Sequence, residues 1–147
     1  LNTETFFFFF KWVLKGNGKN LAKQFNNIFY LLLSEENIAS EIEYIEVVGH
    51  TDYAGDTISN RRLSTERAMS FLNAMVPKDS KLENEFGGKF KASGMSEFET
   101  NPNKEDRDRK DYSKKDIEST KDQRKIEIKM VFSNKDLEEA IKSRTSS

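Results

Sequence analysis

The chain has 147 residues, a formal net charge of -1, 33% charged residues and a mean hydropathy of -0.77. The near-zero net charge gives no global field that would favour nucleic acid or anionic lipid. The absence of cysteine excludes disulfides and thiolate metal sites. This length predicts a single domain over residues 1–147, with its core at about residues 5–133.

The first residues carry no membrane-targeting signal. Residues 1–5 lack the basic region of a signal peptide, and the apolar run after them is too short and too aromatic for a membrane span. The chain does not begin with methionine. We therefore expect a piece of a longer protein whose membrane anchor lies in a segment absent from this chain.

The N-terminal third predicts a strand and a helix. Residues 6–14 form an unbroken aromatic and aliphatic run, which favours an inner strand of a sheet. A partner-binding or membrane-proximal segment is the alternative for this run. Residues 15–18 read as a turn, residues 19–34 have the apolar spacing of a helix, and residues 34–40 read as a polar loop.

The middle of the chain repeats the same order. Residues 42–49 predict a second strand, and residues 60–75 predict a second helix that ends before Pro77. Gly49 and Gly55 are expected to bracket the turn between them, where glycine reaches backbone angles closed to other residues.

After this helix, residues 78–88 form a polar connection and residues 90–93 a short third strand. Residues 97–122 are almost entirely charged in their middle part, which predicts a solvated insertion, with a partner-docking loop as the alternative. Residues 125–132 alternate polar and apolar, as in a half-buried strand. Residues 134–144 suggest a helix capped by Asn134, followed by a frayed tail to residue 147.

This order predicts an α/β (α+β) sandwich. A small mixed four-stranded sheet carries helices on one face, in the order strand, helix, strand, helix, strand, strand.

Three motifs carry a family resemblance. The first is Gly49-His50-Thr51-Asp52, followed by Gly55, Asn60, Leu63-Ser64 and Arg67-Ala68. The second is Gln123-Arg124-Lys125-Ile126-Glu127-Ile128 at the start of the last strand. The third, residues 92–97 followed by Pro102, resembles a Gly-x-Gly-x-x-x-Pro loop with Ser93 in place of its first glycine. Over about residues 42–132 the chain resembles the OmpA C-terminal-like domain, the peptidoglycan-binding module of outer-membrane proteins, peptidoglycan-associated lipoproteins and MotB-type stators.

The residues themselves suggest a small zwitterionic ligand. Asp52 follows a buried strand and Arg67 lies on the next helix, so an acid and a base are held by two rigid elements. The resemblance implies the same ligand type, the meso-diaminopimelate of peptidoglycan, with Asp52 on its ammonium and Arg67 clamping its carboxylate through bidentate hydrogen bonds. Asn60 is expected to cap the helix near the ligand. The predicted ligand-binding residues are Thr51, Asp52, Asn60, Leu63, Arg67 and Arg124.

Several alternatives stay open at this stage. Asp52 and Arg67 could form a salt bridge that only stabilises the fold. A metal site at His50 and Asp52 is disfavoured because the chain has no second histidine and no cysteine. Catalysis is not expected, because the sequence shows neither a nucleophile with a base nor paired acids in a cleft, and no cofactor is expected.

The expected location is the periplasm, tethered to the inner or outer membrane, with peptidoglycan as the partner. The alternatives are the periplasmic domain of a MotB-type stator of an ion-driven motor, and a protein-interaction domain that has lost wall binding. In either case residues 97–122 could dock a second copy of the chain or a membrane protein.

Overall fold

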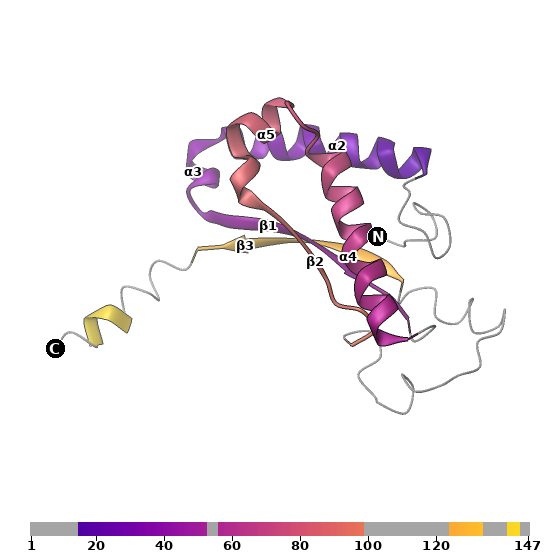
Figure 1. Ribbon diagram of the computed structural model, residues 1–147. Helices are drawn as coiled ribbons and strands as arrows, with labels where there is room; N and C mark the ends of the chain where they lie inside the picture. The colour runs from indigo at the N-terminus through magenta and orange to yellow at the C-terminus, as the bar shows by residue number, and fades with distance from the viewer. Residues whose placement is uncertain (1–14, 53–55, 99–123, 134–140, 145–147) are drawn as a thin grey trace.

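The computed structural model describes residues 15–52, 56–98, 124–133 and 141–144. The described chain contains both helices and strands (Figure 1). In order they are α2 (Gly16–Ser34), α3 (Glu36–Ala39), β1 (Ile42–His50), α4 (Thr57–Met75), α5 (Lys81–Phe86), the 3₁₀ helix η1 (Gly87–Lys89), β2 (Phe90–Gly94) and β3 (Lys125–Phe132). Residues 141–144 are also helical.

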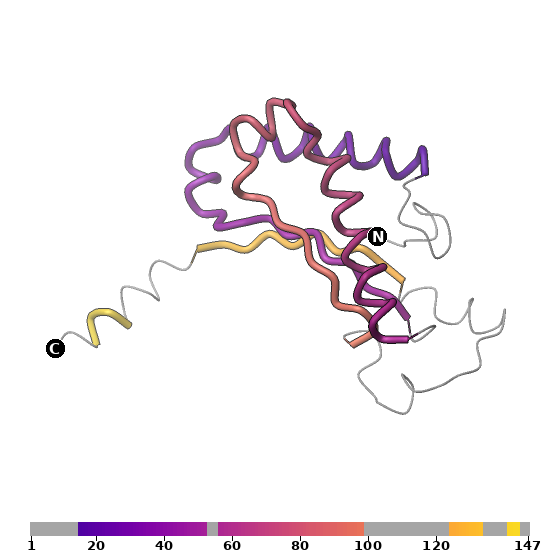
Figure 2. The backbone as a smooth tube through the Cα atoms, viewed as in Figure 1, coloured from indigo at the N-terminus to yellow at the C-terminus, as the bar shows by residue number. Residues whose placement is uncertain are grey.

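The three described strands form one mixed sheet in the order β2-β1-β3. The central strand β1 is parallel to β2, with Val47 opposite Ala92, and antiparallel to β3, with Val47 opposite Ile128. Figure 2 shows the strands side by side, with α2 and α4 on the same side of the sheet. The mixed α/β class with a mixed sheet and packed helices is therefore confirmed. The strand predicted at residues 6–14 lies outside the described residues.

The core lies between this sheet and α2 and α4. Phe29 on α2 and Phe71 on α4 are 4% and 0% exposed, and Phe25 contacts both rings with centroid distances of 5.9 and 6.3 Å. Burial of each large apolar side chain contributes about 1.5–3 kcal/mol to folding. The fully buried strand residues Ile45, Val47 and Ile126 complete this layer. The core thus fixes α4 across β1 and β2.

Both long helices begin earlier than the sequence suggested. The predicted turn at residues 15–18 is wrong, because α2 starts at Gly16. Glycine is tolerated in a first turn, where the amides have no intrahelical acceptor, and the Gly18 amide donates to Asn17 Oδ1 at 3.0 Å. The second helix starts at Thr57 instead of residue 60.

Two short helices replace predicted loops. Residues 36–39 form α3 within the predicted loop, and residues 81–86 form α5 within the predicted polar connection. The signal for α5 is a capping box, in which Ser80 Oγ accepts from the Glu83 amide at 3.2 Å. Buried Leu82 attaches this helix to the core.

Gly49 lies in the predicted strand, but its backbone is not in the left-handed region that the prediction invoked for glycine; Gly55 lies outside the described residues. Gly49 belongs to β1, opposite Gly94 of β2. A Cβ on Gly49 would lie 2.1 Å from the Ser64 carbonyl oxygen, and one on Gly94 would lie 2.4 Å from the Thr65 amide nitrogen. Both glycines are therefore required because α4 passes directly over the strand ends.

The other predicted elements lie partly inside and partly outside the described residues. The strands at residues 42–49, 90–93 and 125–132 are confirmed, with one extra residue on each of the first two. Most of the charged insertion and most of the C-terminal helix, including its cap Asn134, lie outside the described residues. None of the helices in the described ranges combines the length and the hydropathy of a membrane-spanning segment.

Candidate functional site

Four chain segments converge where β1 ends. Parallel strands end at the same edge of a sheet and an antiparallel neighbour begins there, so the ends of β1 and β2 meet the start of β3. The Met95 amide donates to the Gly49 carbonyl, and the Thr51 amide donates to the Ser96 carbonyl, both at 2.9 Å. The first turns of α4 complete this edge.

A buried ion pair occupies this edge. Arg124 Nη1 lies 2.6 Å from Asp52 Oδ2, and both side chains are 4% exposed. Such a charge-assisted bond is short and strong, and removal of either partner would take this bond from a charge that is buried. The sequence predicted that Arg124 touches a ligand; the structure places it against the predicted ammonium acceptor itself.

Asn60 is buried and does not cap α4, so its predicted capping role is wrong. The cap is Asp56, whose Oδ1 accepts from the Ser59 amide at 2.8 Å. The hydrogen bonds from Ser59 hold the pKa of Asp56 below its ordinary value. Asn60 Nδ2 instead donates to the Asp52 carbonyl and to Glu97 Oε2, each at 3.3 Å. Asn60 therefore connects the Asp52 segment to the loop after β2.

Glu97 is a site residue that the sequence reasoning missed, because it was placed in the solvated insertion. It is 2% exposed, and its carboxylate accepts from Thr57 Oγ1 at 2.6 Å, from Ser96 Oγ and from Asn60. Burial raises the pKa of Glu97, but these hydrogen bonds outweigh it and lower the pKa overall. The available signal was its position directly after a strand parallel to β1, at the same edge as Asp52.

The loop between β2 and Glu97 has an unusual backbone. Ser96 has a φ of 55°, in the left-handed region that glycine usually occupies. Ser93, which stands in place of the first glycine of the resembled Gly-x-Gly-x-x-x-Pro loop, is an ordinary β2 residue opposite Val48. The residue with the unusual backbone in this loop is therefore Ser96, whose amide donates to Ser64 Oγ at 3.1 Å.

Arg67 lies on the buried face of α4. Asn60, Ser64 and Arg67 are spaced i, i+4 and i+7, which places them on one side of a helix, and all three are at most 3% exposed. Thr51 is also buried, and Leu63 is half-buried beside this face. Hydrogen bonds join Asp52 to both Asn60 and Arg124. Arg67 lies on the same face of α4 as Asn60.

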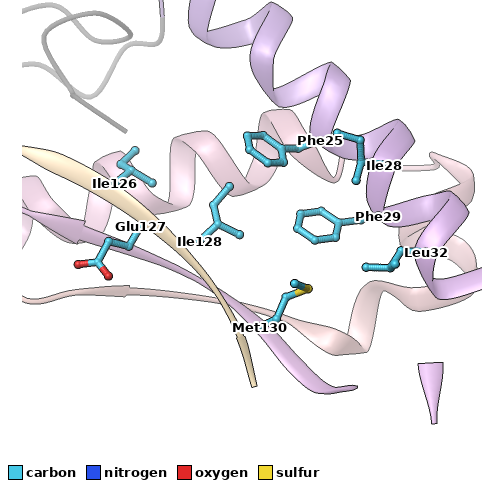
Figure 3. A pocket seen from close by; sticks show the side chains of 8 residues that line it. All are labelled: Phe25, Ile28, Phe29, Leu32, Ile126, Glu127, Ile128 and Met130. Carbon is cyan, nitrogen blue, oxygen red and sulfur yellow. The ribbon is translucent and has the colours of Figure 1, made fainter. Parts of the chain in front are cut away.

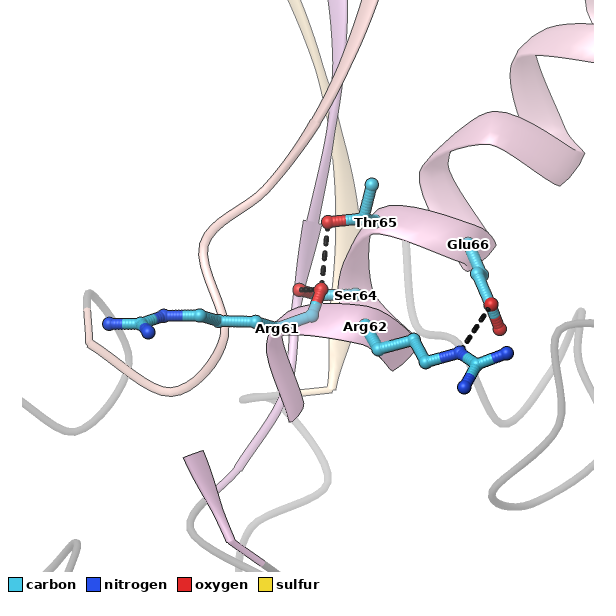
Figure 4. Close-up of polar contacts among 5 residues, drawn as sticks. All are labelled: Arg61, Arg62, Ser64, Thr65 and Glu66. Carbon is cyan, nitrogen blue, oxygen red and sulfur yellow. Dashed lines mark hydrogen bonds and ion pairs between the residues drawn. The ribbon is translucent and has the colours of Figure 1, made fainter. Parts of the chain in front are cut away.

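The outer face of α4 carries a different set of contacts. Arg62 Nε donates to Glu66 Oε1 at 2.8 Å, and the Arg61 side chain extends away from the helix (Figure 4). The Arg61 guanidinium carbon lies 5.6 Å from the Phe98 ring centroid, a cation–π contact. This contact joins α4 to the loop after β2 a second time, one residue beyond Glu97.

His50, the last residue of β1, pairs with a carboxylate of the neighbouring strand β3. Its Nε2 lies 2.7 Å from Glu127 Oε1, and its side chain is fully buried. Burial raises the pKa of Glu127, but the charges of His50, Lys125 and Lys129 outweigh it and lower the pKa. In the part of the chain that the structure describes, no three His, Cys, Asp or Glu residues are grouped to hold a metal ion.

Comparisons add no family assignment: no protein-family model and no curated protein matches the chain. The family resemblance therefore rests on the sequence motifs alone.

Proposed function

We propose that the chain is a non-catalytic peptidoglycan-binding module that anchors a larger envelope protein to the cell wall through diaminopimelate. The observation that carries this proposal is the direct contact between Asp52 and Arg124 at the edge where four segments converge. In this proposal Arg124 fixes the Asp52 carboxylate as the acceptor for the ligand ammonium, and Arg67 on the buried face of α4 supplies the planar donor for the ligand carboxylate.

Each charge has a distinct task in this proposal. A carboxylate has two oxygens and about four acceptor sites, so Asp52 can bind the ligand ammonium while Oδ2 still accepts from Arg124. Arg67 clamps the ligand carboxylate, and Arg124 holds Asp52 in place and adds positive potential. Loss of one partner of such a pair costs about 2–5 kcal/mol. A micromolar complex is worth roughly 8 kcal/mol, so one substitution is enough to abolish detectable binding.

We also propose that the sheet has a fourth strand, which would give the chain the order strand, helix, strand, helix, strand, strand. A groove of about 460 Å³ lies between α2 and β3, and its lining is apolar except for Glu127 (Figure 3). Its lining residues are Phe25, Ile28, Phe29, Leu32, Ile126, Glu127, Ile128 and Met130. Among the described strands, β3 pairs only with β1. Residues 6–14 directly precede α2 and supply the aromatic side chains and the backbone to fill this groove as a fourth strand.

The proposed location is the periplasm, with the module tethered to the inner or outer membrane by a segment outside this chain. Wall binding is shared by an outer-membrane tether and by a stator subunit, so the same site serves either protein.

Co-sedimentation with purified diaminopimelate-type peptidoglycan tests the proposal. We expect the wild type to sediment with the wall, and Arg67→Ala and Arg67→Lys to stay in solution, because lysine is a point donor without the bidentate geometry. Arg62→Ala is the matched control, since the Arg62 side chain is 77% exposed and pairs with Glu66. Circular dichroism confirms folding of each variant. If the folded wild type stays in solution, the proposal fails.

A further inference from the structure

We propose that Glu97 is a positioning residue that fixes the Asp52 segment for ligand binding by orienting the Asn60 side chain. This inference rests on the proposed function, because its effect is measured on the same ligand. It adds a residue to the site that neither the composition nor the motif spacing assigned.

The Asn60 amide is the link between the two acids. Its nitrogen has two N–H donors, and its two described acceptors are the Asp52 carbonyl and Glu97 Oε2, each at 3.3 Å. An acceptor on each donor fixes which way the amide faces. With the amide reversed, its oxygen would face the Glu97 carboxylate and the Asp52 carbonyl, which are both acceptors. Glu97 therefore selects the orientation that holds the Asp52 backbone.

Glu97 is itself held by neighbouring segments. Thr57 Oγ1 donates to Oε1 from the first residue of α4, and Ser96 Oγ donates to Oε2 from the loop after β2. Ser96 is in turn bonded through its carbonyl to the Thr51 amide at 2.9 Å. Two hydrogen bonds therefore hold the Asp52 segment: one from the Asn60 side chain to the Asp52 carbonyl, and one from the Thr51 amide to the Ser96 carbonyl.

The carboxylate suits this role because it only accepts. It meets donors from three side chains, and these hydrogen bonds keep it ionised against the effect of burial. A glutamine could place its oxygen toward Asn60 and its amide toward the Thr57 hydroxyl, which can also accept. Glu97→Gln therefore keeps the contact that matters, whereas Glu97→Ala removes it.

A double-mutant cycle on binding of a soluble diaminopimelate-containing stem peptide tests the inference. We expect Glu97→Ala and Asn60→Ala each to weaken binding roughly tenfold, the scale of coupling within one hydrogen-bond network, and the double variant to bind no more weakly than Asn60→Ala. Glu97→Gln is expected to restore most of the wild-type affinity. Equal binding by wild type and Glu97→Ala, or additive losses in the double variant, would overturn the inference.

A second measurement needs no destabilised variant. In the wild type, the Asn60 side-chain NH₂ protons should exchange with solvent at least tenfold more slowly than those of exposed Asn37, because their donors are engaged in a buried network. Equal exchange rates would refute the fixed amide. Failure of the wild type to bind the peptide would contradict the proposed function instead, and slow exchange of Asn60 would still be expected in that case.

Discussion

Gly49→Ala tests how tightly α4 packs on the sheet. A Cβ at this position would lie 2.1 Å from the Ser64 carbonyl oxygen and 2.9 Å from the Ser64 carbonyl carbon. Ordinary contact begins at 3.4 Å, so the strand and the helix must separate by about 1.3 Å. The obstacle is backbone, which cannot rotate away as a side chain would.

The expected cost follows from that displacement. Overpacking of a core costs typically about 1–3 kcal/mol, and separation of α4 from β1 also disturbs the Asn60 bond to Asp52. We expect urea denaturation to give a free energy of unfolding at least ~2 kcal/mol below the wild type, with an unchanged denaturant slope. Gly88→Ala is the matched control, because its Cβ would meet nothing within 4 Å. Equal stability of Gly49→Ala and wild type would refute the close approach.

Three further predictions concern charges and the groove. Arg124→Met should destabilise the fold by about 3–5 kcal/mol in urea, and Asp52→Asn added to it should recover part of that loss, because the pair is buried; additive losses would refute the pairing. Since the pKa of Glu127 is lowered in the folded state, its stabilising contribution is present above its ordinary value of 4.5 and is lost as the pH falls through the folded pKa. Glu127→Gln should therefore show a shallower loss of stability than wild type below about pH 4.5, and identical pH profiles would contradict the lowered pKa of Glu127. Deletion of residues 1–14 should lower the thermal midpoint and increase binding of an apolar dye, because the groove beside β3 would lose its proposed fourth strand; an unchanged midpoint would argue against that strand.

The strands were predicted best, because their residue types mark them locally. In β3 polar and apolar residue types alternate, and this pattern identified the strand although Met130 and Phe132 are 42% and 55% exposed. The start of α4 could not be predicted from the residue types. Its first two turns bury polar side chains such as Asn60 and Ser64 at the positions where an apolar stripe would mark a helix. With Asp56 and Asn60 both suitable as caps, composition alone could not choose between them.

The site was predictable only in part, because its key contacts join distant segments. Asp52 and Arg124 are 72 residues apart, and local spacing does not show which guanidinium meets which carboxylate. Glu97 precedes a highly charged stretch and bonds to side chains 37 and 40 residues away. Local composition therefore suggested solvent exposure, whereas the fold surrounds this carboxylate with donors.

Titration calorimetry with two soluble stem peptides tests the central claim most directly. One peptide ends in diaminopimelate, and the other carries lysine at that position, which keeps the ammonium and lacks the carboxylate. We predict that the wild type binds the diaminopimelate peptide and that the lysine peptide loses about 2–5 kcal/mol, since Arg67 would have no carboxylate to clamp. Equal affinity for both peptides, or no binding of either by the folded wild type, would contradict recognition of the zwitterion.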